Sequence, residues 1–241
     1  MKRWAIALLL CLLCGCGVKE DSMAPPISVQ QQVPQPVWEQ APIGYVALTF
    51  DDGPTPVHTA RLLDGLKERG IHATFFLAGY RLEGNEALVR RMKAEGHQIG
   101  NHSYDHAQLT TLSQVAALED LTRCDLALCT LLGEGGYWVR PPYGSIHPQT
   151  LLALDVPVIC WSVDPLDWAG KTAEEIAGHI VHNAVDGDII LLHDCYRSTV
   201  DAALQAADGL LARGFRLVTV AEMLAAKDVD VQNGRIYYCG K

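Results

Sequence analysis

From Ile43 onward the chain alternates between two patterns of apolar and polar positions. Short apolar runs typical of buried strands are separated by stretches in which apolar residues recur at helical spacing. The predicted strands are 45–49, 71–77, 97–101, 137–140, 156–162, 188–193 and 216–220. The predicted helices are 58–69, 86–95, 113–132, 148–154, 172–183, 199–212 and 220–226. Because this alternation favours parallel strands with helical crossovers, we predict an α/β fold, a distorted (β/α) barrel of about seven parallel strands. A flat doubly wound sheet is the alternative.

The first 42 residues have a different character. Lys2 and Arg3 precede an apolar run at 4–13, which is the pattern of a secretory signal and too short for a comfortable membrane span. Leu-Cys-Gly-Cys at 13–16 resembles a bacterial lipobox, in which Cys16 would be acylated, although an ordinary signal peptide is the alternative. We therefore predict a lipoprotein-type signal peptide at 1–16, a Pro/Gln-rich tether at 17–42, a folded domain at 43–227 and a C-terminal tail at 228–241.

Composition and charge limit the classes of partner that we expect for this chain. The chain is 49% hydrophobic and 20% charged, so it can bury a sizeable core. A net charge of −9 gives no basic footprint, so nucleic acid is not an expected partner. We expect a monomer whose only membrane attachment is the N-terminal lipid. Of the eight cysteines, those at 11, 14 and 16 belong to the signal region, and the sequence leaves the pairing of the other five open.

Residues with useful chemistry follow the predicted strands. They are Asp51 and Asp52 after the first strand, His102 and His106 after the third, Arg140 after the fourth, Asp164, Asp167 and Trp168 after the fifth, and His193 after the sixth. In β/α barrels the site forms at the C-terminal ends of the strands. Each residue alone has a simpler explanation, such as a turn, a surface histidine or a salt bridge. Their arrival at one rim predicts a single active site there.

Asp52, His102 and His106 form a candidate metal site. The two histidines are four residues apart, so one turn of helix would place both imidazoles on one face. Two histidines and one carboxylate leave coordination positions open, which is typical of a catalytic rather than a structural site. Zn²⁺ is the first candidate, with Co²⁺ or another divalent ion possible.

The remaining polar residues suit acid–base chemistry. Asp51 could act as a general base, with Arg140 holding it ionised by charge pairing. His193 could protonate a leaving group, with Asp164 or Asp167 orienting it. Trp168 and Leu191 could wall a pocket for a small apolar group.

Five segments together carry a resemblance. They are Thr-Phe-Asp-Asp-Gly at 49–53, His-Ser-Tyr-Asp-His at 102–106, Arg-Pro-Pro-Tyr at 140–143, Asp-Pro-Leu-Asp-Trp at 164–168 and Leu-Leu-His at 191–193. In this order they resemble the polysaccharide deacetylases, the NodB-homology domains of carbohydrate esterase family 4, over about residues 43–226. The resemblance implies a distorted β/α barrel that removes acetyl groups from N-acetylhexosamine polymers.

The resemblance also implies roles for single residues. It makes Asp51 the base, His193 the acid, Arg140 the partner of Asp51 and Asp164 the favoured partner of His193. It makes Asp52, His102 and His106 the metal ligands, and it gives the backbone amide of Tyr143 the oxyanion. We assign Asp167 to substrate binding with Tyr143, Trp168 and Leu191.

Export and a lipid anchor would place such an enzyme beside the cell wall. Peptidoglycan N-acetylglucosamine is therefore the first expected substrate, followed by chitin oligomers and O-acetylated xylan. A catalytically inactive wall-binding protein on the same fold is the rival from another class, and the complete set of site residues argues against it.

Overall fold

The computed structural model describes residues 41–241. The predicted signal peptide, Cys16 and most of the tether lie outside the described residues. The strands are β1 Gly44–Asp51, β2 Thr74–Leu77, β3 Gln98–Asn101, β4 Val158–Ile159, β5 Ile189–His193, β6 Phe215–Leu217 and β7 Ile236–Tyr237. The helices are α1 His58–Glu68, α2 Glu86–Ala94, α3 Gln114–Leu132, α4 Pro148–Leu152, α5 Ala173–Asn183, α6 Arg197–Ala212 and α7 Val220–Ala226. Short 3₁₀ turns occupy Gly79–Arg81, Leu109–Thr111, Pro142–Gly144 and Asp167–Ala169.

The main sheet has five strands with β1 at its centre. Its order is β3-β2-β1-β5, and β6 pairs with the first residues of β1. All these pairings are parallel, which confirms the predicted α/β fold. Every residue of β1 except Tyr45 is buried, as expected for a parallel strand covered on both faces.

The other segments of the barrel are connected by isolated β-bridges rather than by ladders. They join Val139 to Asn101 and to Val158, and Val163 to Ile190, all in parallel. The segments thus follow one another around a distorted barrel, but the described residues form no continuously hydrogen-bonded closure. The predicted strand at 137–140 is reduced to the bridge at Val139, and the one at 156–162 is reduced to β4.

Proline explains why these two segments form such short pairings. Pro141 and Pro142 follow the bridge at Val139, and Pro157 directly precedes β4. Proline has no backbone N–H to donate to a ladder, so regular pairing stops beside it. The predicted strand at 216–220 is also shortened, because Thr219 caps α7 and its side chain accepts a hydrogen bond from the backbone N–H of Glu222.

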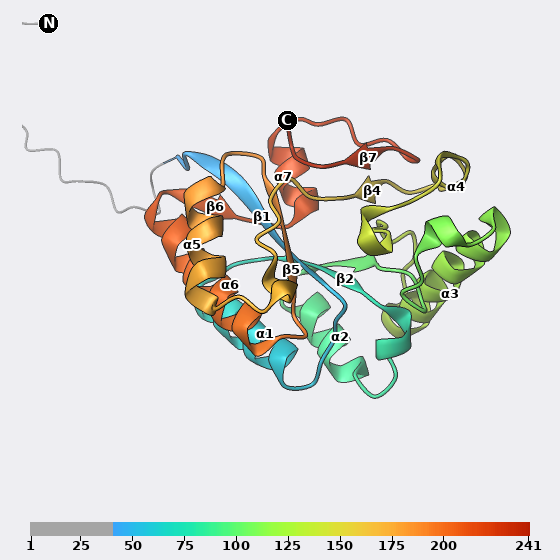
Figure 1. Ribbon diagram of the computed structural model, residues 1–241, viewed down its shortest axis with the longest axis horizontal. Coiled ribbons are helices and arrows are strands. Elements are labelled where there is room, and N and C mark those ends of the chain that lie inside the picture. The colour runs from blue at the N-terminus through green and yellow to red at the C-terminus, as the bar shows by residue number, and fades with distance from the viewer. Residues whose placement is uncertain (1–40) are drawn as a thin grey trace, which may run out of the picture. The chain divides into compact units, whose positions relative to one another are not determined.

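The helices begin and end close to the predicted positions. Ser113 caps α3 by accepting from the backbone N–H of Ala116, and Gly133 ends that helix with a φ of 79°. In Figure 1 α1, α5 and α6 lie together on one side of the sheet, and α3 lies on the other side of the molecule. The main core forms between the sheet and these helices, with Phe50 and Phe75 stacked at its centre.

The segment after Lys227 is part of this fold, in contrast to the prediction of an added tail. Its strand β7 pairs in parallel with β4, and the two lie side by side in Figure 1. The Tyr237 ring is 7% exposed, and its hydroxyl accepts from the backbone N–H of Gln232 at 2.8 Å. Gly240 donates from its backbone N–H to the carbonyl of Gly187 at 2.8 Å. The boundary placed at residue 227 therefore divides a continuous structural unit.

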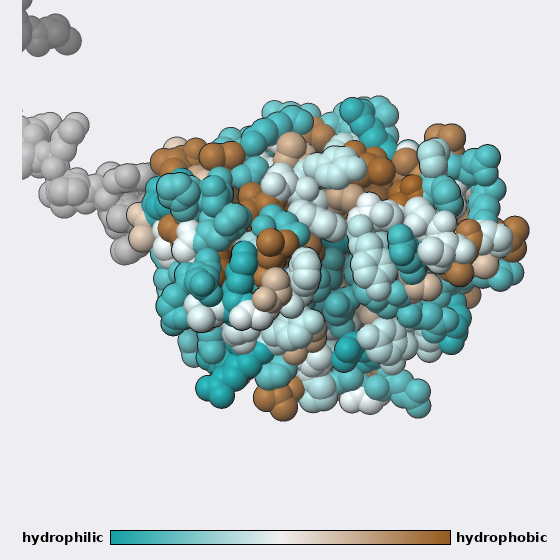
Figure 2. Space-filling view, viewed as in Figure 1, coloured by the Kyte–Doolittle hydropathy of each residue, from teal (hydrophilic) through white to brown (hydrophobic). Residues whose placement is uncertain are grey.

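Two further observations concern the whole described region. The five cysteines within residues 41–241 are all free: Cys124, Cys129, Cys160, Cys195 and Cys239. No helix between residues 41 and 241 combines the length and the apolar character needed to cross a membrane. On the face seen in Figure 2, hydrophobic residues form separate patches among hydrophilic ones.

Candidate active site

The carboxyl ends of three parallel strands of the main sheet bring the predicted residues together. Asp51 is the last residue of β1, and the register pairs it with His193, the last residue of β5. Asn101 ends β3, so His102 enters the same edge from the other side. Parallel pairing is the cause, because it places the ends of these strands at one edge of the sheet.

Asp52, His102 and His106 converge on one point. Oδ1 of Asp52 lies 3.0 Å from Nε2 of His106 and 3.4 Å from Nε2 of His102. One ligand atom from each residue lies within 4.8 Å of the other two. Oδ1 of Asp52 is buried and accepts no hydrogen bond. A buried carboxylate oxygen facing two imidazole nitrogens is what a divalent cation requires, so these residues fit a metal ion.

The backbone that aims the two histidines differs from the prediction. Residues 102–106 form no helical turn; Ser103 and His106 instead have left-handed φ values of 64° and 55°. The turn is held by side chains: Asn101 accepts from the Ser103 N–H at 2.9 Å, and Ser103 Oγ accepts from the His106 N–H at 3.1 Å. The spacing of four residues thus brings both rings together through a tight loop rather than a helix.

His102 is oriented by the backbone behind it. Its Nδ1 lies 2.7 Å from the carbonyl oxygen of Arg140. That carbonyl can only accept, so Nδ1 must carry the proton and donate it. The lone pair of the neutral ring is therefore on Nε2, which faces Asp52. A ligand histidine needs such a partner to fix its tautomer.

The charges within the cluster are strongly coupled. Burial raises the pKa of Asp52, but the adjacent imidazoles of His102 and His106 more than offset this and hold it well below its usual range. The Asp52 carboxylate in turn raises the pKa of His106. The cluster is therefore built around an ionised carboxylate that attracts positive charge.

Asp51 faces a different partner. Arg140, which is fully buried, donates from Nη1 to Asp51 Oδ1 at 2.8 Å and to Thr49 Oγ1 at 2.7 Å. Its other nitrogens donate to the carbonyls of Ile159 at 3.1 Å and Cys160 at 3.0 Å. The guanidinium is thereby fixed in one orientation, and it keeps a positive charge beside Asp51.

Asp167, and not Asp164, contacts His193. Asp167 Oδ1 lies 2.8 Å from His193 Nδ1, and its Oδ2 accepts from the His193 backbone N–H at 2.8 Å. Asp164 accepts from the backbone N–H of Leu166 at 2.8 Å. Its carboxylate therefore closes the turn, and our preference for Asp164 as the partner of His193 was wrong. The placement of Asp167 among substrate-binding residues also has to be revised, because its side chain is fully buried.

The pairing with Asp167 governs the charge on His193. Burial lowers the pKa of His193, but the hydrogen-bonded carboxylate of Asp167 outweighs it and raises that pKa to about 9. The imidazole is therefore protonated near neutral pH, and its Nε2–H is available as a proton donor.

One cavity of about 460 Å³ is lined by Asp51, Asp52, His102, His106, Asp164 and His193. Its walls include Tyr143 and Trp168, which are 65% and 55% exposed, and Leu191, which is buried. Trp161 and Tyr196 also line it, and sequence reasoning missed both. Their positions in the sequence could have indicated this, because Trp161 closely follows β4 and Tyr196 lies three residues after His193.

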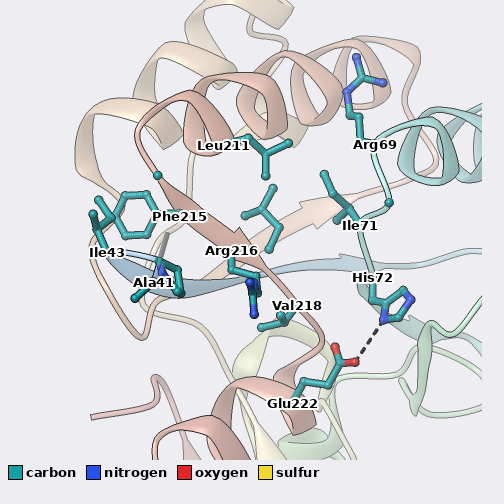
Figure 3. Close-up of a pocket in the computed structure, with 14 residues that line it drawn as sticks. Ala41, Ile43, Arg69, Ile71, His72, Leu211, Phe215, Arg216, Val218 and Glu222 are labelled. Carbon is teal, nitrogen blue, oxygen red and sulfur yellow. Dashed lines mark hydrogen bonds and ion pairs between the residues drawn. The ribbon is translucent and has the colours of Figure 1, made fainter. Parts of the chain in front are cut away.

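A second cavity, of about 590 Å³, lies elsewhere. Figure 3 shows its lining, with Ile43 and Phe215 on one side and the hydrogen-bonded pair of His72 and Glu222 on the other. Ile43, Ile71 and Phe215 stand at or before the starts of β1, β2 and β6. This cavity is therefore at the amino ends of the strands, away from the residues described above.

The sequence is similar to those of known proteins. The profile of the polysaccharide deacetylase family matches residues 39–155. A peptidoglycan-N-acetylglucosamine deacetylase of Bacillus cereus is 37% identical over 198 residues, which cover 76% of this chain and 89% of that protein. The chain belongs to the polysaccharide deacetylase family. This confirms the resemblance carried by the five segments.

Other members of the family agree in sequence and fold. The peptidoglycan-N-acetylmuramic acid deacetylase PdaC of Bacillus subtilis is 39% identical over 182 residues, 76% of this chain and 39% of that protein. A solved structure of PdaC has a TM-score of 0.75 and covers 77% of this chain and 92% of the PdaC chain. A family 4 acetyl xylan esterase from Clostridium thermocellum, solved with a cobalt ion, is 32% identical, with a TM-score of 0.76 and coverage of 81% and 98%.

This chain is shorter than several of its relatives. It spans about two fifths of the length of PdaC and of the Listeria monocytogenes peptidoglycan-N-acetylglucosamine deacetylase PgdA. The shared region is the domain that carries the site.

Proposed function

We propose that this protein is a metal-dependent hydrolase that removes N-acetyl groups from N-acetylglucosamine residues of a cell-wall polysaccharide, most readily peptidoglycan. The observation that carries the proposal is the cluster of Asp52, His102 and His106, which shares one cavity with Asp51 and His193. A metal-ligand set beside a carboxylate and a protonated imidazole suits hydrolysis of an amide.

Asp52, His102 and His106 would hold the metal ion. Such an ion supplies Lewis acidity toward the acetyl carbonyl and the attacking water. Zn²⁺ is our first choice, because two histidines and a carboxylate with open positions suit it. Co²⁺ is the alternative, and a cobalt ion is present in the related acetyl xylan esterase structure.

The side chains around this site would divide the proton transfers. Asp51 would accept a proton from the attacking water, and Arg140 at 2.8 Å holds its carboxylate in one orientation. His193, protonated and held by Asp167, would give its proton to the departing amine. A positioned acid or base of this kind contributes roughly 10²–10⁴-fold to the rate.

The carbonyl oxygen and the acetyl methyl group also need partners. Tyr143 has a left-handed φ of 60°, and we assign its backbone amide to the developing oxyanion. The methyl group would lie against Leu191 and Trp168, which form an apolar wall of the cavity. The exposed rings of Tyr143, Trp168 and Tyr196 at the rim suit the apolar faces of sugar rings.

Peptidoglycan is preferred for two reasons. The relatives named above include deacetylases of peptidoglycan N-acetylglucosamine and N-acetylmuramic acid. The sequence of residues 1–16 also favours export toward the wall. A chitooligosaccharide deacetylase or an acetylxylan esterase is the alternative, because a chitin deacetylase and the xylan esterase are related too.

Release of acetate from a substrate panel tests the proposal. The purified protein, stripped of metal and reconstituted with Zn²⁺ or Co²⁺, is incubated with peptidoglycan, chito-oligomers and acetylated xylan. We expect metal-dependent release, fastest from peptidoglycan. Metal binding without acetate from any of the three would instead favour a catalytically inactive wall-binding protein.

We further propose that the protein is a monomer held at the membrane through lipid on Cys16, with residues 17–42 as a tether. The lipobox-like Leu-Cys-Gly-Cys at 13–16 supports this. Mass spectrometry of the mature N-terminus tests it: Cys16 should carry acyl chains, and Cys16→Ser should abolish them. An unmodified N-terminus at another residue would contradict the anchor.

A further inference from the structure

The carboxylate of Asp167, which contacts His193 twice, also accepts a hydrogen bond from a third donor. Oδ2 of Asp167 accepts the hydroxyl proton of Thr199 at 2.8 Å, in addition to the backbone N–H of His193. Oδ1 is left for the His193 imidazole. Asp167 is 2% exposed and Thr199 is fully buried, so no solvent replaces these contacts.

Thr199 reaches Asp167 because of where it sits in α6. The helix begins at Arg197, just after the loop that follows β5, and Thr199 is in its first turn. The same helix packs against α1, α5 and β5, so the hydroxyl is held by a rigid element of the core. A β-branched side chain also has few χ1 rotamers, which keeps the hydroxyl in place.

This arrangement has a chemical consequence for the acid. A buried carboxylate stays ionised only if donors satisfy its oxygens. With Oδ2 occupied by two donors, Asp167 is fixed in the plane that presents Oδ1 to Nδ1 of His193. The imidazole then keeps one orientation, with Nε2 free to face the cavity.

We propose that Thr199 is a positioning residue for the deacetylation reaction, acting through Asp167 on His193. The inference rests on the proposed function, since it assumes that His193 is the acid of that reaction. Thr199 touches no reacting atom, so it should affect turnover and not substrate affinity.

Three variants separate positioning from packing. Thr199→Val keeps the shape and removes the hydroxyl, whereas Thr199→Ser keeps the hydroxyl. Thr150→Val makes the same change at a buried threonine of α4, which forms no hydrogen bond with Asp167, His193 or Thr199. We expect Thr199→Val to lower kcat by roughly 10-fold, part of what a general acid contributes, with KM within about twofold. Thr199→Ser should restore most of kcat, and Thr150→Val should behave like the wild type.

A second measurement needs no substrate. The Nδ1–H proton of His193 should give a low-field ¹H NMR resonance near neutral pH, assigned by its loss in His193→Gln. We expect this resonance to broaden or shift upfield in Thr199→Val and to remain in Thr199→Ser. If Thr199→Val does not fold, Thr199→Ala is measured in its place.

The two measurements also separate failure of this inference from failure of the proposed function. Wild-type acetate release with an unchanged kcat and resonance in Thr199→Val would overturn the role of Thr199. A wild type that releases no acetate would overturn the deacetylase proposal, and the resonance would still decide whether Thr199 positions His193.

Discussion

Asp51 and Asp52 are adjacent in the chain, yet the nearest charged partner of each carboxylate is different. Asp51 Oδ1 lies 2.8 Å from Nη1 of Arg140, and Asp52 Oδ1 lies 3.0 Å from Nε2 of His106. Asp51 ends the extended strand, whereas Asp52 has a left-handed φ of 69°. This change of backbone direction gives the two carboxylates different nearest partners, although Asp51 Oδ2 also lies 3.7 Å from Nε2 of His102. Under the proposed function, Asp51 would act as the base and Asp52 as a metal ligand.

Neutral substitutions at the two aspartates should therefore have different effects on metal binding and activity. Asp52→Asn should lose bound metal and activity together, because an amide is a poor replacement for a carboxylate ligand. Asp51→Asn should keep its metal while kcat falls by roughly 10²–10⁴-fold, because only the proton acceptor is lost. Metal content by elemental analysis and acetate release, measured on the same preparations, check both. If Asp51→Asn lost its metal and Asp52→Asn kept metal and activity, the two roles are exchanged.

The pH dependence of turnover should depend on Asp167. The pKa of His193 is raised to about 9, so its acid form is lost as the pH rises through that value. We expect kcat to fall above about pH 9 and Asp167→Asn to move this limb to lower pH. Asp164→Asn should leave the limb in place, because its carboxylate contacts Leu166 and not His193. If Asp164→Asn moved the fall of kcat at high pH and Asp167→Asn did not, the pairing of Asp167 with His193 would be contradicted.

The same pairing contributes to stability in a defined pH window. The folded pKa of His193 lies above its ordinary value of 6.5, so the stabilisation is complete below pH 6.5 and is lost as the pH rises through about 9. The free energy of unfolding of the wild type should therefore decline over this window. Urea denaturation at several pH values should show a smaller decline for Asp167→Asn.

Removal of Arg140 should destabilise the fold as well as the site. Arg140→Met leaves the buried Asp51 carboxylate without its positive partner, at a cost of about 3–5 kcal/mol in the free energy of unfolding. Arg61→Met is the matched control, because the side chains of the Arg61–Asp201 ion pair are 49% and 30% exposed, and such a pair should be worth at most about 1 kcal/mol. Urea denaturation of both variants checks this, and equal losses would show that Arg140 is not a buried charge partner.

The C-terminal segment should behave as part of the domain. Tyr237→Ala removes a buried ring beside β4 and should lower the free energy of unfolding by about 3–5 kcal/mol. Tyr238→Ala, at a neighbour that is 54% exposed, should change it by no more than about 0.5 kcal/mol. A Tyr237→Ala variant as stable as Tyr238→Ala would restore the view of an added tail.

The sequence by itself determined the strands of the core and the residues at their ends. Apolar runs such as 45–49 and 188–193 are buried strands wherever they pair, and Asp51 and His193 must then lie at the same edge. Proximity of this kind follows from parallel pairing alone, so Asp51, His102 and His193 could be placed at one edge of the sheet without knowledge of the loops. The five segments also identified the family.

Only the tertiary structure decided how the loops use their residues. Among the described residues, the non-glycine positions with positive φ are Asp52, Ser103, His106, Tyr143, Leu166 and Asp228. All but Asp228 lie in loops of the site. Non-glycine residues rarely adopt this conformation, and the surrounding packing has to impose it. Local sequence therefore gave no sign of it, and a helical turn was wrongly expected at 102–106.

The choice between Asp164 and Asp167 has the same cause. The two aspartates are three residues apart and equally suited to hold His193. The left-handed φ of 58° at Leu166 turns the chain between them, so that Asp164 closes the turn and Asp167 points into the core. There Asp167 meets Thr199 from α6. Contacts between segments this far apart depend on how the helix packs on the sheet, and so neither the partner of His193 nor the place of Tyr237 beside β4 could be predicted from the sequence.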